Sequence, residues 1–271
     1  MNYPELEKLI QVVKDLRRPV TGCPWDLKQT HKSLLKYLIE ESYEFIEATE
    51  SEKSLEMQDE LGDVLLQVLL HSTIASQEKT FDLESVAKNL SEKLIRRHPH
   101  VFKDPSLATN AEEVVKNWEE IKKEEKQSNG GASSSRIDKS YLNFPALFSA
   151  NKIGVKTAKL NFDWDNAQQV AYKVEEEWQE LKEELVASKI SKERVTEEMG
   201  DFLFSGAQLA RHLGIDPEDC LRQANKKFLR RFNHMERLIE EDGKILEEMN
   251  QSEMDVFWDS AKSQEKAAKN N

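Results

Sequence analysis

The two halves of this 271-residue chain carry the same five landmarks in the same order, and this repeat constrains the fold most. In the first half they are Trp25-Asp26, Glu40–Glu44, Asp59–Asp63, Lys93–Arg97 and Trp118. In the second half they are Trp164-Asp165, Glu176–Glu180, Glu197–Asp201, Lys227–Arg231 and Trp258. Five landmarks separated by similar gaps indicate an internal duplication, in which both copies form the same arrangement of elements.

The segment between the two copies differs in composition from the rest of the chain. From Gln127 to Ser135 it reads Gln-Ser-Asn-Gly-Gly-Ala-Ser-Ser-Ser. Glycine, serine and asparagine at this density are typical of a flexible linker. We therefore predict a first domain over residues 1–126, a linker over residues 127–139 and a second domain over residues 140–271.

The spacing of apolar residues predicts helices in both copies. Leu34, Leu38 and Phe45, for example, recur on one helix face. Asp216-Pro217 is a cap followed by the proline that often opens a helix, and His98-Pro99 predicts the end of another. No stretch shows sustained alternation of apolar and polar residues, as a half-buried strand requires. The fold class is therefore all-α, with two tandem helical bundles of four or five helices each.

Charge and cysteine content exclude several classes of protein. The formal net charge is −12, which disfavours binding to a nucleic-acid backbone, because that binding needs basic patches. Cys23 and Cys220 are too few and too far apart for a disulfide framework or a paired-cysteine zinc site. No apolar stretch approaches membrane-spanning length, and no secretory signal is found. We expect a cytoplasmic protein without nucleic-acid or membrane partners.

Each copy contains two acidic pairs spaced three residues apart, which places both side chains of a pair on one helix face. They are Glu41 with Glu44, Glu60 with Asp63, Glu177 with Glu180, and Glu198 with Asp201. Most such pairs on helices are solvated surface. Here, however, apolar residues follow Asp63 and Asp201 directly and predict buried helices. Buried carboxylates need a proton, a basic partner or a metal, and oxygen-only ligands favour Mg²⁺, with Mn²⁺ as the alternative.

Two further features bear on these acidic helices. Gly62 and Gly200 lie between the acids of one pair in each copy, and glycine inside a helix costs about 1 kcal/mol relative to alanine. This predicts either a close helix crossing or plain packing there. A di-iron bundle would use Glu-x-x-His motifs, but the residues three positions after Glu44 and Glu180 are also glutamates, which argues against it.

Basic clusters follow the acidic pairs in both copies. They comprise Lys93, Arg96 and Arg97 in the first copy and Lys226, Lys227, Arg230 and Arg231 in the second. Alone, such clusters are usually solvated helix faces. After paired acids they fit a phosphate clamp, because the arginine fork matches phosphate oxygens. The tryptophans near the clusters, Trp118 and Trp258, either stack on a base or complete the core.

Taken together, these motifs resemble the MazG family of nucleoside triphosphate pyrophosphohydrolases. The resemblance rests on Cys23–Asp26, the Glu-Glu-x-x-Glu and Glu-x-Gly-Asp pairs, and Arg96–Phe102. It implies an all-α fold, Mg²⁺ held by four acids, and homodimers; uncovered apolar residues such as Leu238 and Ile239 also suggest pairing. It further implies cleavage of ribo- and deoxyribonucleoside triphosphates, ATP among them, between the α and β phosphates. The products would be the monophosphate and pyrophosphate.

The resemblance also assigns roles to residues and associates hydrolysis with the second copy. The metal ligands of that copy would be Glu177, Glu180, Glu198 and Asp201, matched in the first copy by Glu41, Glu44, Glu60 and Asp63. Nucleotide contacts would be Lys173, Lys227, Arg231 and Trp258, with Arg230 beside them and Arg96 and Arg97 in the first copy. Glu177 and Glu180 are the candidates for accepting the proton of the attacking water. The copies differ at Tyr37, which stands opposite Lys173.

A non-catalytic function is the alternative. A duplicated helical module can also act as a dimeric nucleotide sensor or as an adaptor for partner proteins. The presence of all four acids in both copies favours metal chemistry in at least one of them.

Overall fold

The computed structural model describes residues 2–128, 135–137 and 139–269. The chain divides into two compact units, residues 1–132 and 133–271. Both units are helical, and the described ranges contain no strand, so the all-α prediction is confirmed. None of the helices in these ranges is long and apolar enough to cross a membrane.

The boundary between the units falls within the predicted linker. Residues 129–134 and 138 of that linker lie outside the described residues. Its first two residues, Gln127 and Ser128, instead form the end of helix α7. The domain limits 1–126 and 140–271 stay predictions.

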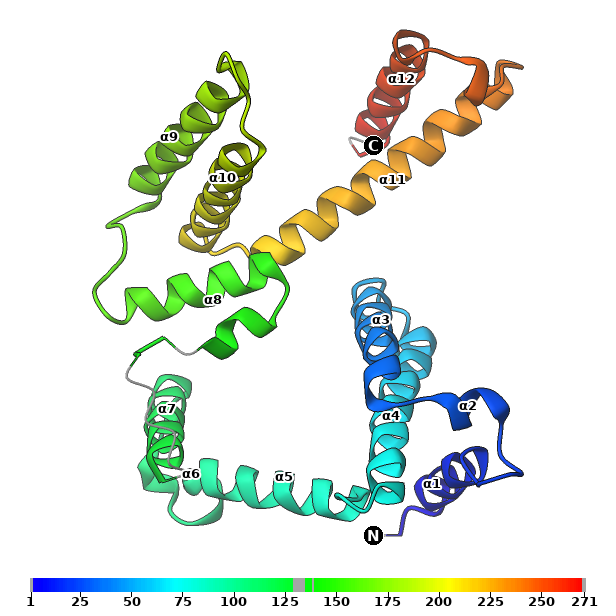
Figure 1. Ribbon diagram of the computed structural model, residues 1–271, viewed down its shortest axis with the longest axis vertical. Coiled ribbons are helices and arrows are strands. Elements are labelled where there is room, and N and C mark those ends of the chain that lie inside the picture. Colours follow the sequence, from blue (N-terminus) through cyan, green and yellow to red (C-terminus); the bar gives the residue numbers. More distant parts are fainter. Residues whose placement is uncertain (1, 129–134, 138, 270–271) are drawn as a thin grey trace. The chain divides into compact units, whose positions relative to one another are not determined.

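The first unit has five helices of at least 13 residues and two short ones in its described part (Figure 1). The long helices are α1 (Pro4–Leu16), α3 (His31–Glu50), α4 (Ser54–Gln77), α5 (Leu83–Arg97) and α7 (Ala111–Ser128). The short ones are α2 (Pro24–Lys28) and α6 (Pro99–Phe102), and a 3-10 turn η1 (Pro105–Leu107) precedes α7. As predicted, α5 ends directly before His98-Pro99.

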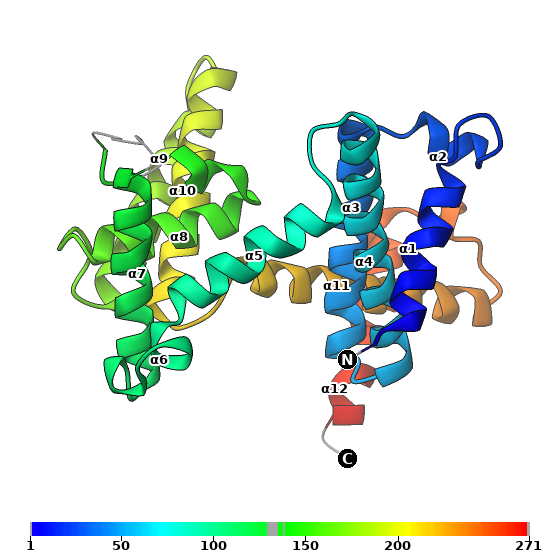
Figure 2. The ribbon, with the colours of Figure 1, turned by 90° about the horizontal axis from the view of Figure 1, so that it is seen from below.

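The core of the first unit lies between α1, α3 and α4. Val13, Leu34, Leu69, Leu70 and Ile74 are buried together there, and Figure 2 shows α1 beside α4. The α3–α4 pair is an antiparallel hairpin (Figure 1). α5 starts against this core with Leu83, and α7 packs on α5.

The second unit repeats the hairpin and adds a long helix. Its elements are η2 (Lys139–Asn143), α8 (Ala146–Ala158), α9 (Ala167–Val186), α10 (Lys192–His212), α11 (Pro217–Glu241), η3 (Leu246–Glu248) and α12 (Gln251–Lys269). α9 and α10 form the hairpin, and α8 packs on α10 through the Gln208 amide, which donates to the Ala150 carbonyl at 2.8 Å. Asp216 caps α11 and Pro217 opens it, as predicted.

Leu238 and Ile239 correct one expectation from the sequence. From the sequence, both residues are expected to be uncovered and available for pairing between chains. Instead, Ile239 is buried with Met235 and Ala261, and Leu238 packs against the same cluster between α11 and α12. The following helix of the same chain covers this face, so these two residues do not support a dimer.

The acidic hairpins expose apolar residues that the sequence placed in a buried helix. On α4, Leu61, Leu65 and Val68 are 53%, 36% and 39% exposed. On α10, Leu203 and Phe204 are likewise exposed. In the described part of each unit, therefore, no neighbouring helix covers this side of the hairpin.

The glycines of the hairpins also differ from the expectation of a close helix crossing. A Cβ atom added at Gly62 or Gly200 would meet no atom within 4 Å. Among the described residues, no other helix of the same unit therefore approaches closely enough to require glycine at either position.

Candidate active site

The α9–α10 hairpin brings three of the four predicted metal ligands together. Carboxylate oxygens of Glu177 and Glu180 from α9 and of Glu198 from α10 lie within 4.8 Å of one another. Glu177 and Glu198 are buried, whereas Glu180 is exposed. The cluster thus has a buried floor and a side open to solvent. Asp201, the fourth predicted ligand, does not join this cluster.

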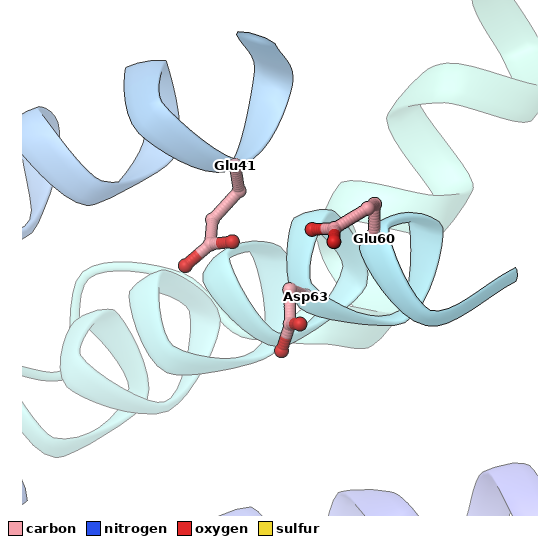
Figure 3. Close-up of side chains that lie close together, drawn as sticks. All are labelled: Glu41, Glu60 and Asp63. Carbon is pink, nitrogen blue, oxygen red and sulfur yellow. The ribbon is translucent and has the colours of Figure 1, made fainter. Parts of the chain in front are cut away.

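The α3–α4 hairpin builds the matching cluster of the first copy. Oxygens of Glu41, Glu60 and Asp63 lie within 4.8 Å of one another, and Figure 3 shows Glu41 on one helix facing the other two on the next. Glu44 is outside this set but lies close enough to Glu60 for its charge to raise the pKa of Glu60. Each copy therefore brings three of its four predicted ligands together. The ligand outside the cluster is Glu44 in the first copy and Asp201 in the second.

Crowding of like charges changes the proton affinity of these acids. Burial raises the pKa of Glu41 above its usual value, and the charges of Asp63 and Glu44 raise it further. Partial desolvation raises the pKa of Glu180, Glu177 adds to this effect, and Lys173 opposes it. Partial desolvation and the charge of Glu44 raise the pKa of Glu60 in the same way. Such clusters favour a bound proton or a cation.

Two basic side chains accompany the second cluster. The Lys173 ammonium lies 2.7 Å from Glu177 and 3.0 Å from Glu176, and these hydrogen bonds raise the pKa of Lys173. Arg194 lies 3.2 Å from Glu198 and 2.9 Å from Glu184. Lys173 is predicted from the sequence as a nucleotide contact, whereas Arg194 is not predicted, although its spacing of four residues from Glu198 is typical of an ion pair on one helix face.

The first copy has no cation at either equivalent position. Tyr37 stands opposite Lys173, and Glu56 stands opposite Arg194 when Glu60 is aligned with Glu198. Tyr37 packs against the Trp25 ring at 5.6 Å, and Glu56 pairs with Lys53 at 2.6 Å. The acids are therefore duplicated, but the cations that accompany them are not.

The predicted phosphate clamps lie away from the acids of their own unit. In the second unit α11 leads away from the α9–α10 hairpin (Figure 1), and Arg231 and Arg230 bind Glu265 of α12. Trp258 packs on Phe228, with ring centroids 5.2 Å apart, and Lys227 is exposed. Among the described residues, no ion pair joins Lys227, Arg230 or Arg231 to the acids Glu177, Glu180, Glu198 and Asp201.

The first copy shows the same arrangement. Arg96 and Arg97 both bind Glu125 of α7 at 2.6 Å, and the Arg97 guanidinium lies 5.7 Å from the Trp118 ring. Glu125 and Glu265 were not singled out from the sequence, where no motif marks either of them.

Comparison with known proteins identifies the family. The MazG nucleotide pyrophosphohydrolase domain matches residues 29–102 and 166–236, which span both acidic hairpins. The chain belongs to the MazG family. It is 47% identical to "Nucleoside triphosphate pyrophosphohydrolase/pyrophosphatase MazG" of Thermotoga maritima, over 94% of this chain and 95% of that protein. The resemblance inferred from the motifs is confirmed.

Other relatives extend over the whole chain too. A "Nucleoside triphosphate pyrophosphohydrolase" of Escherichia coli K12 is 39% identical over 96% of this chain and 98% of its own length. "Uncharacterized protein YabN" of Bacillus subtilis is 43% identical over 97% of this chain, which corresponds to 53% of that protein. Both copies of the MazG domain are thus present in full-length relatives.

Glu180 should make the metal-free protein less stable as the pH rises. Its raised folded-state pKa means that the folded chain holds more protons than the unfolded chain between the two pKa values. This stabilisation is complete below the unfolded pKa and is lost as the pH rises through the folded pKa. We expect Glu180→Gln to raise the melting temperature in EDTA by a few degrees at about pH 7 and to leave it unchanged at about pH 4.

The measurement is a series of thermal melts between these two pH values. Glu125, Asp163 and Glu265, whose pKa values are lowered to about 2, stay ionised throughout this range. An effect of Glu180→Gln that is equal at both pH values would contradict the crowding of charges described above.

Proposed function

We propose that this protein hydrolyses nucleoside triphosphates to nucleoside monophosphates and pyrophosphate in a Mg²⁺-dependent reaction. The observation that carries the proposal is the cluster of Glu177, Glu180 and Glu198, with oxygens within 4.8 Å of one another and Lys173 and Arg194 beside it. The names of the Thermotoga maritima and Escherichia coli relatives support the same reaction class.

The donor set of the cluster fits a hard divalent cation. All three ligands are carboxylates, and no histidine or cysteine belongs to the group. Oxygen-only ligands suit Mg²⁺, with Mn²⁺ as the alternative, and disfavour zinc. We propose Glu177, Glu180 and Glu198 as ligands, with Asp201 one turn after Glu198 as the fourth. When bound, the cation would neutralise charge on the triphosphate and on the leaving pyrophosphate.

The side chains of the site have distinct tasks in this proposal. Lys173 and Arg194 hold the carboxylates of Glu177 and Glu198 at fixed positions through hydrogen bonds. Exposed Glu180, whose pKa is raised, is suited to accept the proton of the attacking water, with Glu177 as the second candidate. Arg231, Arg230 and Lys227 would bind the phosphates, and Trp258 would contact the base.

We assign most of the hydrolysis to the second copy. Its cluster has Lys173 and Arg194, where the first copy has Tyr37 and Glu56. Positive charge close to the acids favours approach of an anionic triphosphate. Glu41, Glu44, Glu60 and Asp63 of the first copy stay candidate ligands of a second metal site, with Arg96 and Arg97 as its clamp.

The proposed substrates are ribo- and deoxyribonucleoside triphosphates, in keeping with a cytoplasmic enzyme. Incubation of the purified chain with such a panel and Mg²⁺ separates catalysis from the alternative of a dimeric sensor or adaptor. We expect turnover of several triphosphates. Saturable binding of the triphosphates without any turnover would contradict the enzymatic function and favour the sensor.

We propose that the active form is a homodimer. The apolar residues exposed on the two hairpins, such as Leu61 and Leu65 on α4 and Leu203 and Phe204 on α10, support it, because contiguous apolar surface marks protein interfaces. Gly62 and Gly200, open in the single chain, lie on the same helices. A second chain can also supply the clamp that lies away from the acids of its own unit.

Light scattering should therefore give twice the 31.4 kDa of one chain. Leu203→Glu should shift the protein towards monomer, because a charge in an apolar interface is costly. Leu213→Glu, which changes an equally exposed residue at the end of α10, is the matched control. A wild-type mass of one chain at micromolar concentration would argue against the dimer.

A further inference from the structure

The two arginines of each basic cluster share one carboxylate from the following long helix. Glu265 of α12 binds Arg231 and Arg230, and Glu125 of α7 binds Arg97 and Arg96. The same contact forms although 28 residues separate Arg97 from Glu125 and 34 separate Arg231 from Glu265. Both carboxylates also lie outside the segments that match the MazG domain. The two units therefore form the same contact although the spacing between arginine and glutamate differs.

The shared carboxylate is ionised and largely shielded from solvent. Hydrogen bonds from Arg231 and Arg230 lower the pKa of Glu265 to about 2. The Glu265 side chain is 14% exposed, whereas those of Arg231 and Arg230 are 26% and 56% exposed. The carboxylate is thus less exposed than the two guanidinium groups that bind it. Arg230, Arg231 and Glu265 together carry one net positive charge.

The two copies differ in which nitrogen atoms the carboxylate engages. Arg97 gives Glu125 both its Nε, at 3.2 Å, and its terminal Nη2, at 2.6 Å. Arg231 gives Glu265 only its Nε, at 2.6 Å. Glu125 therefore occupies one edge of the Arg97 fork. Glu265 fixes the plane of the Arg231 guanidinium while making no hydrogen bond to its terminal nitrogens.

A cavity of about 520 Å³ borders the Arg231–Glu265 pair. Its six lining residues include three basic ones, Arg231, Lys262 and Lys266, and two acidic ones, Asp259 and Glu265. Of these, Lys262 pairs with Asp259 at 3.0 Å. Trp258 and Glu265 are seven residues apart on α12, which places them on one helix face. A nucleotide whose base contacts Trp258 would have its phosphates near this cavity and near Arg231 and Lys266, which line it.

We propose that Glu265 is a positioning residue of the phosphate clamp, which orients Arg231 so that its terminal nitrogens bind a phosphate of the nucleotide in the adjacent cavity. In the first copy, Glu125 instead closes the fork of Arg97. This inference rests on the proposed function, because it names how that site grips its substrate.

The test compares Glu265→Gln with wild type in the full chain. The probe is an α,β-methylene analogue of ATP with Mg²⁺, titrated by calorimetry, alongside steady-state kinetics with ATP. Losing a charge-assisted hydrogen bond that orients Arg231 should raise Kd for the analogue and KM about tenfold. The value of kcat should stay within a factor of about two, since weakened binding alone changes KM. The matched Glu125→Gln should change Kd and KM less than about twofold.

A second variant separates positioning from general damage to the fold. If Glu265 acts through Arg231, then adding Glu265→Gln to Arg231→Lys should change Kd no further. Equal melting temperatures would show that both variants are folded. An unchanged or lower Kd for Glu265→Gln, or additive effects in the double variant, would overturn the proposal.

Binding and turnover also separate this inference from the proposed function. If wild-type protein binds the analogue without hydrolysing ATP, the proposed enzymatic function is wrong. The ratio of the Kd of Glu265→Gln to the Kd of wild type would still test the role of Glu265. Wild-type protein that does not bind the analogue would overturn both.

Discussion

Glu177→Gln should lower kcat by orders of magnitude while leaving the helical fold intact. The change keeps the size of the side chain but removes one charge from the cluster of Glu177, Glu180 and Glu198. It also removes one of the two carboxylates that bind the Lys173 ammonium, the one at 2.7 Å, and leaves Glu176 at 3.0 Å. A ligand to a catalytic cation contributes several kcal/mol of transition-state stabilisation, so we expect a loss of roughly 10²–10⁴-fold.

Glu41→Gln is the matched control in the first copy. It removes the equivalent charge from the cluster of Glu41, Glu60 and Asp63, which has no lysine or arginine at the positions of Lys173 and Arg194. We expect its kcat to fall less than about threefold, because the second copy remains whole. Equal losses from both variants would show that both copies work. A larger loss from Glu41→Gln would reverse the assignment.

Removing divalent cations should abolish activity. Without them, the acids of each cluster face a polyanionic triphosphate directly, and each pair of like unit charges at 4 Å costs about 1 kcal/mol even in water. Several such pairs act together on each phosphate, so dialysis against EDTA should leave less than about 1% of the activity. Mg²⁺ should restore it, and Mn²⁺ should do the same.

Restoration of activity by Mg²⁺ distinguishes loss of the cation from denaturation of the protein. Circular dichroism of the EDTA-treated chain should still show a helical protein, because the cores around Leu34 and Ile239 contain no acid of the clusters. Full turnover after exhaustive dialysis against EDTA would contradict the metal-dependent proposal.

Local patterns predicted the helices and the acidic clusters well. The spacing within Glu41–Glu44, Glu60–Asp63 and their counterparts depends only on helix geometry, and the hairpins bring three acids of each set together. Cap residues such as Asp216, with Pro217 after it, fix where a helix begins through contacts within one turn. These interactions are short-range along the chain, so the sequence contains them.

Long-range pairings were harder to foresee. Leu238 and Ile239 pack under α12, and Glu265 binds Arg231 across 34 residues, neither of which a periodic pattern reveals. The burial predicted after Asp63 is only partly right, because Leu69 and Leu70 are buried, whereas Leu65 is exposed and no helix in the described part of the first unit covers it. A sequence pattern shows that a helix face is apolar, but not which surface covers it.

Identifying the reaction products tests the central proposal most directly. Purified full-length chain would be incubated with ATP and Mg²⁺, and the products would be separated by anion-exchange chromatography at early times. The proposed function predicts AMP and pyrophosphate in equal amounts, with no ADP accumulating at any time. ADP and orthophosphate as the main products would contradict it, because the bond broken would then lie between the β and γ phosphates.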